Sequence, residues 1–400
     1  LSLFRDHGCT GTECRDGWIG RAMRSAFLAL SDRMQVAAAN LSRQISRVPV
    51  KLGPEPGEAM DRNTAKAEIE RNHRSWIAAL APYRQARPLR STIEIAVTAL
   101  PFVCLWGLLA LAVLNGHWWA LLLTVPAAGF LVRLFVLQHD CGHGALFARR
   151  RANDWTGRVI GVFTLTPYDY WRRTHAVHHA TTGNLDKRGI GDVDTLTVRE
   201  YRARSFWGRL RYRLYRHPVV MFGFGPAWLF ICQYRLPLGL MRAGLEPWTS
   251  TIVTTVGAAI PVALLMWLMG PLAFLTVQLP ITLMAATAGV WLFYIQHQFE
   301  ETHWSEGRNW DFQNAALNGS SHYDLPRPLR WITGNIGIHH VHHLAAKVPF
   351  YRLPEVLRDY PELRDTGRIT LMESLRCVRF VLWDERTGRL VSFRQARLSA

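Results

Sequence analysis

The fold is decided by residues 93–143, which read IEIAVTALPFVCLWGLLALAVLNGHWWALLLTVPAAGFLVRLFVLQHDCGH. Two long apolar blocks lie in this stretch, at 93–114 and 118–137, and only Asn115-Gly116-His117 separates them. Each block is close to the roughly 20 residues that cross about 30 Å of hydrocarbon as a helix. The stretch therefore predicts two transmembrane helices that form a hairpin.

A second pair of apolar blocks, at 251–269 and 272–295, has the same layout and is split by Gly270 and Pro271. The alternative is a soluble protein with two buried hairpins, but apolar stretches of this length are hard to cover in a soluble fold. The sequence therefore predicts four transmembrane helices in two hairpins.

The segments between the apolar blocks are rich in arginine, and the chain has a formal net charge of +17. Two hairpins place both chain ends and residues 138–250 on one side of the membrane, and the positive-inside rule predicts the cytoplasmic side. Within this segment, residues 199–216 are very basic but interleaved with apolar residues. They predict a surface helix on anionic head groups rather than a nucleic-acid patch. Residues 218–232 are apolar but short, which indicates an interfacial or re-entrant segment.

Residues 1–60 mix glycine, proline and charge without a sustained period and lack a signal-peptide pattern. We expect a peripheral, disordered segment, part of which precedes a natural start at Met34 or Met60.

The six cysteines form no CxxC pair, which indicates a reducing compartment and argues against structural zinc or an iron–sulfur cluster. Haem-attachment, dinucleotide and Walker motifs are also absent from the sequence, so redox chemistry would depend on the histidines.

Eight of the sixteen histidines form three motifs, which are HDCGH at 139–143, HAVHH at 175–179 and, within HHVHH at 339–343, an HxxHH spacing that uses 339, 342 and 343. Residues i and i+4 share a helix face and i+3 lies beside them, so each cluster can direct two imidazoles at one point. Imidazole favours zinc, copper, iron or nickel. Because eight clustered ligands exceed what one four-coordinate ion needs, we expect two metal ions.

Three further histidines are candidates for the predicted ligand set. His297 follows the fourth apolar block and suits a ninth ligand, with His303 as its rival. His340 points away from the face that its neighbours share and is left out. The predicted metal ligands are His139, His143, His175, His178, His179, His297, His339, His342 and His343. We predict no catalytic residue beyond these ligands. The expected fold is thus an all-α integral membrane protein whose cytosolic helical cap holds a histidine-rich dimetal site.

The order HDxxH, HxxHH and HxxHH around two hairpins resembles the pattern of membrane fatty acid desaturases, most closely the bacterial delta-12 or omega-6 branch. The similarity continues at 179–186, 191–194, 294–300 and 351–354, and it covers about residues 90–395. It implies a desaturase domain over 61–395, two iron ions held by the histidines, and O2 as co-substrate. It also implies that a cis double bond is inserted into a lipid acyl chain.

The resemblance implies two partners, a membrane lipid acyl chain and a separate electron donor. The sequence lacks the HPGG motif of a fused cytochrome b5, and its arginine-rich surface would attract an acidic, ferredoxin-like donor. Asp140, Asp192 and Asp194 are candidates to orient ligand imidazoles by accepting their second N–H. Asn335 is a candidate to hold a metal-bound water.

Two other functions compete with desaturation. A di-iron hydroxylase or ketolase acting on alkanes or carotenoids would use the same metal chemistry. A metal transporter would need polar ligands near the bilayer midplane, whereas the histidine clusters lie outside the apolar blocks. Within these blocks we expect Arg133 to be the only clear charge. The expected location is a bacterial inner membrane, with the metal site and both termini in the cytoplasm.

Overall fold

The computed structural model describes residues 76–189 and 191–398, most of which are helical. The predicted peripheral segment 1–60, including both candidate start positions, lies outside the described residues, as does the beginning of the predicted domain 61–395. The first described elements are α3 (Trp76–Ala79) and the 3-10 helix η1 (Ala81–Arg84).

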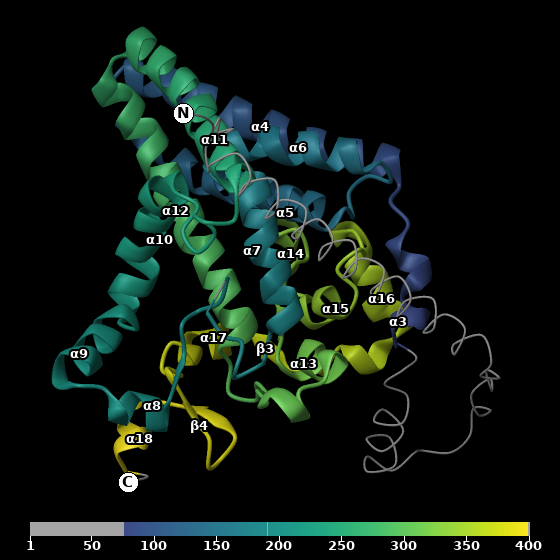
Figure 1. Ribbon diagram of the computed structural model, residues 1–400. Helices are drawn as coiled ribbons and strands as arrows, with labels where there is room; N and C mark the ends of the chain where they lie inside the picture. The colour runs from purple at the N-terminus through teal and green to yellow at the C-terminus, as the bar shows by residue number, and fades with distance from the viewer. Residues whose placement is uncertain (1–75, 190, 399–400) are drawn as a thin grey trace, which may run out of the picture. The chain divides into compact units, whose positions relative to one another are not determined.

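Four segments of the described chain are helical, long and apolar enough to cross a membrane (Figure 1). They are α4 (Pro88–Leu114), the 3-10 helix η2 (Trp118–Leu123) continued by α5 (Thr124–His143), α11 (Leu245–Met269) and α12 (Pro271–His297). The predicted hairpins are confirmed. The helices run past the apolar blocks, because backbone hydrogen bonding continues into polar residues. For this reason α5 and α12 each end on a histidine.

Both hairpin turns follow from their residues. Asn115 caps α4 and Gly116 has a φ of 76°, a left-handed conformation that glycine adopts without strain. Gly270 has a φ of 82°, and Pro271 then occupies the first turn of α12, where its missing N–H removes no helix hydrogen bond. Trp119 and Trp267, beside these turns, are largely exposed, which suits an aromatic belt at a membrane interface.

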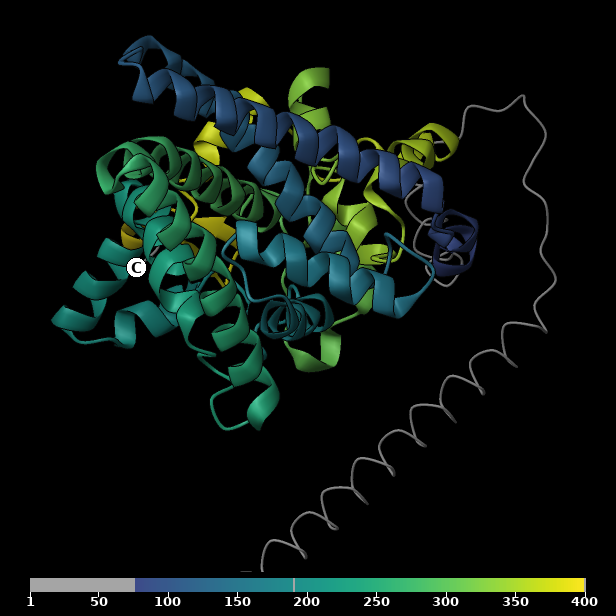
Figure 2. The same cartoon turned by 90° about the horizontal axis from the view of Figure 1, so that it is seen from above.

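The helix α5 is the most enclosed of the four membrane helices. In its most apolar stretch 56% of the residues are buried, against 11% in α11. It packs against α4, α12 and α6 (Arg150–Phe163), and Figure 2 shows α4 along the edge of this bundle. Polar side chains on α5 are therefore kept away from lipid.

A buried ion pair joins the two helices of the first hairpin. Glu94 of α4 accepts a hydrogen bond from the Arg133 guanidinium of α5 at 2.5 Å, and both side chains are almost fully buried. Arg133 also donates to the Trp331 carbonyl and lies 4.1 Å from the centre of the Trp331 ring. The expectation that Arg133 is the only charge in a span is wrong, because Glu94 lies in the first span and neutralises it.

The remaining elements form a cap that carries most of the histidines. Between the hairpins lie α6, α7 (Tyr168–Thr181), β1 (Leu196–Thr197), α8 (Val198–Ala203), α9 (Phe206–Tyr215), the π-helical turns η3 (Val220–Phe224) and η4 (Trp228–Cys232) around α10 (Gly225–Ala227), and η5 (Gln233–Arg235). After α12 come η6 (Gly307–Asn309), α13 (Phe312–Asn318), β2 (His322–Asp324), α14 (Arg327–Ile332), α15 (His339–Leu344), η7 (Phe350–Arg352), α16 (Leu353–Asp359), η8 (Pro361–Leu363), β3 (Arg368–Thr370), α17 (Leu371–Cys377), β4 (Leu382–Asp384), β5 (Arg389–Val391) and α18 (Phe393–Leu398). The all-helical prediction holds for the bulk of the chain.

Two small sheets fasten the C-terminal segment to the cap. β4 pairs in parallel with β1 and antiparallel with β5, while β2 pairs in parallel with β3. Each strand has only two or three residues, too few for an alternating pattern to indicate it in the sequence.

The basic segment 199–216 forms all of α8 but its first residue, and all of α9, rather than one surface helix. Thr197 and Ser205 each accept a hydrogen bond from a backbone N–H at a helix start, so both helices have an N-cap of their own. Phe206 and Trp207 are exposed, as a surface helix requires. Arg216, however, is 3% exposed and faces inward, which corrects its assignment to the basic surface.

The apolar segment 218–232 lies along α12. The Thr287 hydroxyl of α12 donates to the Phe222 carbonyl at 2.7 Å, while Phe224 and Trp228 are exposed. The interfacial or re-entrant placement of this segment remains a prediction.

Candidate metal centre

The nine predicted ligands come from four helix segments. His139 and His143 lie in the last turn of α5, which ends there because Gly144 adopts a φ of 67°. His175, His178 and His179 lie on α7, and His339, His342 and His343 on the short α15. His297 is the last residue of α12. The two helices that end on histidine therefore bring their ligands to the cap.

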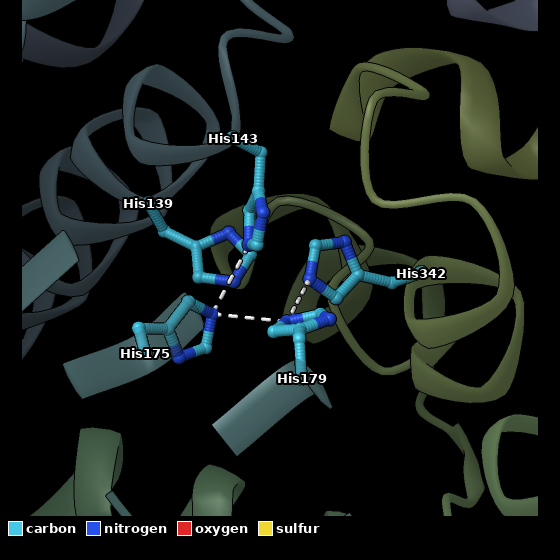
Figure 3. Close-up of side chains that lie close together, drawn as sticks. All are labelled: His139, His143, His175, His179 and His342. Carbon is cyan, nitrogen blue, oxygen red and sulfur yellow. Dashed lines mark hydrogen bonds between the residues drawn. The ribbon is translucent and has the colours of Figure 1, made fainter. Parts of the chain in front are cut away.

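Among the described residues, the structure sorts these nine histidines into two groups that could each hold a metal ion. We call them the five-histidine group (His139, His143, His175, His179 and His342) and the four-histidine group (His178, His297, His339 and His343). Within each group, the candidate ligand atoms lie within 4.8 Å of one another. Figure 3 shows the imidazoles of the five-histidine group turned toward a common centre.

Helical spacing explains how each HxxHH motif is divided. His175 and His179 are four residues apart and share the five-histidine group, whereas His178 belongs to the other group. In the third cluster the arrangement is reversed, because His339 and His343 share the four-histidine group and His342 crosses over. Each motif thus contributes to both groups.

The histidines meet through their Nε2 atoms. In the five-histidine group, the Nε2 atoms of His175 and His143 are 3.1 Å apart, and those of His342 and His179 are 3.2 Å apart. In the four-histidine group, His297 Nε2 lies 3.1 Å from that of His178 and 3.0 Å from that of His339. Ligand atoms about 2.0–2.1 Å from one ion lie roughly 2.9–3.4 Å from each other, so both groups fit metal coordination.

The histidines of the cap are held in the neutral form that binds metals. Burial, reinforced by neighbouring imidazoles, holds the pKa of His175, His179, His339, His342 and His343 well below the usual histidine range. A neutral imidazole carries one N–H, so Nε2 lone pairs that face one another repel unless a cation lies between them. The donor set therefore fits two cations.

Three Nδ1 atoms have acceptors that fix the ring with Nε2 facing its group. His178 Nδ1 donates to the Asp192 carboxylate at 2.5 Å, and His297 Nδ1 to the Gly319 carbonyl at 3.2 Å. His139 Nδ1 lies 3.4 Å from the Asp140 carboxylate, which also accepts from the Phe350 backbone N–H at 2.7 Å. Such outer hydrogen bonds set the tautomer and orientation of a metal ligand.

Two of the candidate supporting residues make other contacts. Asp194 is exposed, and its backbone groups, rather than its carboxylate, make its hydrogen bonds, with Tyr212, Tyr215 and Arg216. The carboxylate of Asp194 therefore orients no described ligand, which corrects that expectation. Asn335 donates to the Phe350 carbonyl at 3.2 Å, and its assignment to a metal-bound water stays a prediction.

The histidines left out of the ligand set also have partners of their own. His340 Nε2 donates to the Leu363 carbonyl at 2.8 Å, and its ring lies 5.6 Å from that of His322. His303, the rival of His297, is exposed and contacts the Ser305 hydroxyl at 2.9 Å. The structure therefore places His297, and not His303, among the grouped histidines.

Sequence reasoning missed two residues that support the groups. Trp171 stacks on His175 at 4.5 Å with an interplanar angle of 16°, and its i, i+4 spacing on α7 was a signal for this contact. The Gly319 carbonyl that accepts from His297 lies 22 residues further along the chain, and no sequence signal points to it.

A small cavity borders the four-histidine group. Its lining includes His178 and His297, and its remaining walls carry Asp192, Arg188 and Gln298. The side chains of the five-histidine group are more exposed to solvent, because His143 and His179 are half-buried while all four members of the other group are buried.

Comparison with known proteins now gives the family. The sequence profile of the fatty acid desaturase family matches residues 116–373. A fatty acid desaturase of Bacillus subtilis is 43% identical over 315 residues, which are 79% of this chain and 89% of the relative.

More distant relatives come from the cyanobacterium Synechocystis. An sn-1 oleoyl-lipid 12-desaturase is 27% identical over 232 residues, 56% of this chain and 63% of the relative. An sn-1 acyl-lipid omega-3 desaturase (ferredoxin) is 28% identical over 230 residues, 55% of this chain and 61% of the relative. The chain belongs to the fatty acid desaturase family and is an integral membrane oxidoreductase of that type.

Proposed function

We propose that this desaturase inserts a cis double bond of the delta-12 or omega-6 type into the acyl chain of a membrane lipid, and uses O2 and two iron ions. The observation that carries the proposal is the convergence of nine imidazoles in two adjoining groups through their Nε2 atoms. The 12-desaturase among the relatives, which acts on an oleoyl lipid, supports the position of the double bond.

The nine ligands would be His139, His143, His175, His179 and His342 for one ion, and His178, His297, His339 and His343 for the other. An unactivated CH2–CH2 pair has no acidic proton and no leaving group, so side-chain acid–base chemistry alone cannot oxidise it. Two bound iron ions with O2 supply the oxidising power for that step. The reaction consumes O2, two hydrogens from the acyl chain, two electrons and two protons, and it releases two waters.

The protein's own part is to place and shield the reacting carbons. Depth along the binding path would decide which CH2 pair reaches the metal ions. The apolar outer faces of α11 and α12 offer a lipid tail a path that avoids water, since residues such as Ile260 and Leu272 are exposed there. Residues 61–395 would form this catalytic domain, in line with one apolar core that extends from Trp76 to Cys377.

We further propose that the two electrons come from a separate ferredoxin-like protein. The omega-3 desaturase of Synechocystis is named as a ferredoxin enzyme, which supports this donor. The net charge of +17 would attract an acidic donor by steering its approach. By the positive-inside rule, the arginine-rich cap would face the cytoplasm of a bacterial cell, with the four spans in its inner membrane.

Expression in a host that makes only monounsaturated lipids tests the proposal. We expect a new double bond six carbons from the methyl end, located by mass spectrometry of the fatty acid methyl esters. A hydroxylated or keto product would contradict desaturation, and a double bond elsewhere would contradict the delta-12 assignment. The purified protein should contain two irons per chain, and zinc instead of iron would contradict the cofactor.

A further inference from the structure

Arg216 is a buried cation that lies beside the four-histidine group. It caps the end of α9 and is only 3% exposed. Every acceptor that the structure gives it among the described residues is neutral: the carbonyls of Asp194 and Phe380, the hydroxyls of Thr195 and Tyr294, and the side-chain oxygen of Gln298. Burying a charge without an opposite charge is costly, so Arg216 requires an explanation.

The hydrogen bonds of Arg216 join two chain segments that adjoin the four-histidine group. Nη1 donates to the Asp194 carbonyl at 3.3 Å and to Thr195 at 3.2 Å, just after Asp192, the acceptor for His178. Nη2 donates to Gln298 at 2.9 Å and to Tyr294 at 3.1 Å, on either side of His297.

A third segment is tied to the same point. Nη2 of Arg216 also donates to the Phe380 carbonyl at 2.8 Å, and Tyr294 donates to this carbonyl at 3.0 Å. Guanidinium has five N–H donors in a rigid fork, which lets one side chain reach acceptors on three segments, whereas lysine has three donors on a flexible stem. The number of donors explains why a charged side chain occupies a neutral site.

We propose that Arg216 is a positioning residue for the four-histidine group, which holds the Asp192 segment and the end of α12 at a fixed separation. The inference rests on the proposed dimetal function. His297 ends α12, and His178 of α7 is hydrogen-bonded to Asp192 of the other segment, so the separation of the two segments sets the approach of the two Nε2 atoms, which are 3.1 Å apart. The five-histidine group receives none of its members from α12 and would not depend on Arg216.

Titration of the metal-free protein with Co²⁺ alone, followed by visible absorption, tests this role without turnover. The wild-type protein should bind two ions per chain. Arg216→Met should bind one ion with wild-type affinity, while the affinity for the second falls about tenfold or more, as when an outer hydrogen bond to a ligand is lost. Arg216→Lys should fall between the two.

Arg235→Met is the matched control. Arg235 is likewise held only by neutral groups among the described residues, namely the Thr255 hydroxyl and the carbonyls of Leu165 and Phe230, but it contacts neither histidine group. This variant should bind two ions as the wild type does. Gln298→Met should weaken the second ion less than Arg216→Met, and the double variant should match Arg216→Met.

Each other outcome overturns a defined statement. Two ions bound normally by Arg216→Met would overturn the inference, as would equal weakening of both ions in step with lost helix content, since Arg216 would then support only the fold. Wild-type binding by Arg216→Lys would show that the charge, and not the set of hydrogen bonds, matters. If the wild-type protein bound no Co²⁺, the dimetal function itself would fail.

Discussion

The two histidine groups use the same side chain but differ in how the protein supports them. In the four-histidine group every ligand is buried, and two of the four rings have close Nδ1 acceptors, Asp192 and Gly319. In the five-histidine group two rings are half-buried, and the carboxylate nearest to an Nδ1 is Asp140 at 3.4 Å. The five-histidine group has one more ligand, whereas the four-histidine group has more outer hydrogen bonds that fix the orientation of its rings. The two sites should therefore respond differently to the same perturbation.

Removing one ligand from each group gives the largest expected effect. His143→Ala and His178→Ala should each lower iron from two to one per chain. Each should also lower desaturation by more than the roughly 10–100-fold that the loss of an outer hydrogen bond costs. Metal analysis and fatty acid profiling measure both. His303→Ala is the control, because His303 is exposed and lies outside both groups. Full activity in either ligand variant would exclude that histidine from the site.

The two groups should release their metal ions to a chelator at different rates. A chelator reaches partly exposed ligands first, so the five-histidine group should lose its ion in a faster phase than the fully buried group. Release followed by absorption should therefore have two phases, and His143→Ala should lack the fast one. A single phase in the wild-type protein would mean that the difference in burial has no effect on metal exchange.

The two carboxylates that lie beside ligand Nδ1 atoms, Asp192 and Asp140, should differ in whether they affect metal affinity or folding stability. Asp192→Ala removes the acceptor 2.5 Å from His178 Nδ1, so metal affinity at the four-histidine group should fall about 10–100-fold. Asp140→Ala should act more on folding, because Asp140 also accepts from the Phe350 N–H, and a lost buried hydrogen bond costs about 1–3 kcal/mol. Metal titrations and thermal melts of both variants separate the two effects, and equal metal affinities would contradict the comparison.

The smallest effect is expected at His340, which lies between ligands on α15 but faces away. His340→Gln should keep both metal ions, because the His340 ring donates to the Leu363 carbonyl and belongs to neither group. Stability should fall by no more than the roughly 1–3 kcal/mol of one buried hydrogen bond. Loss of an ion in this variant would show that α15 has another orientation.

Much of this arrangement could be predicted from local pattern. Hydrophobic length alone indicated the four spans, and the i, i+4 spacing indicated which imidazoles could share a face. The spacing does not say which pair of one motif meets which single histidine of the other, because that depends on how α7 and α15 pack against each other. The same limit explains Arg216, which has the composition of a basic surface segment and is buried by contacts with α12 and Phe380. The pairing of Glu94 with Arg133 could not be predicted for the same reason, because the two residues lie 39 positions apart in the chain.

The pair of Glu94 and Arg133 has a consequence for how the protein enters the membrane. A lone charge at the centre of an inserting helix costs about 2.5–3.5 kcal/mol, which weakens the insertion of that helix on its own. Once α4 and α5 lie together, the two charges neutralise each other at 2.5 Å. Glu94 also pairs with Arg90 of its own helix, whereas Arg133, in the middle of its span, has Glu94 as its carboxylate partner. The first hairpin should therefore insert as one unit during synthesis, and α5 made without α4 would leave Arg133 without this carboxylate and the helix poorly retained in the bilayer.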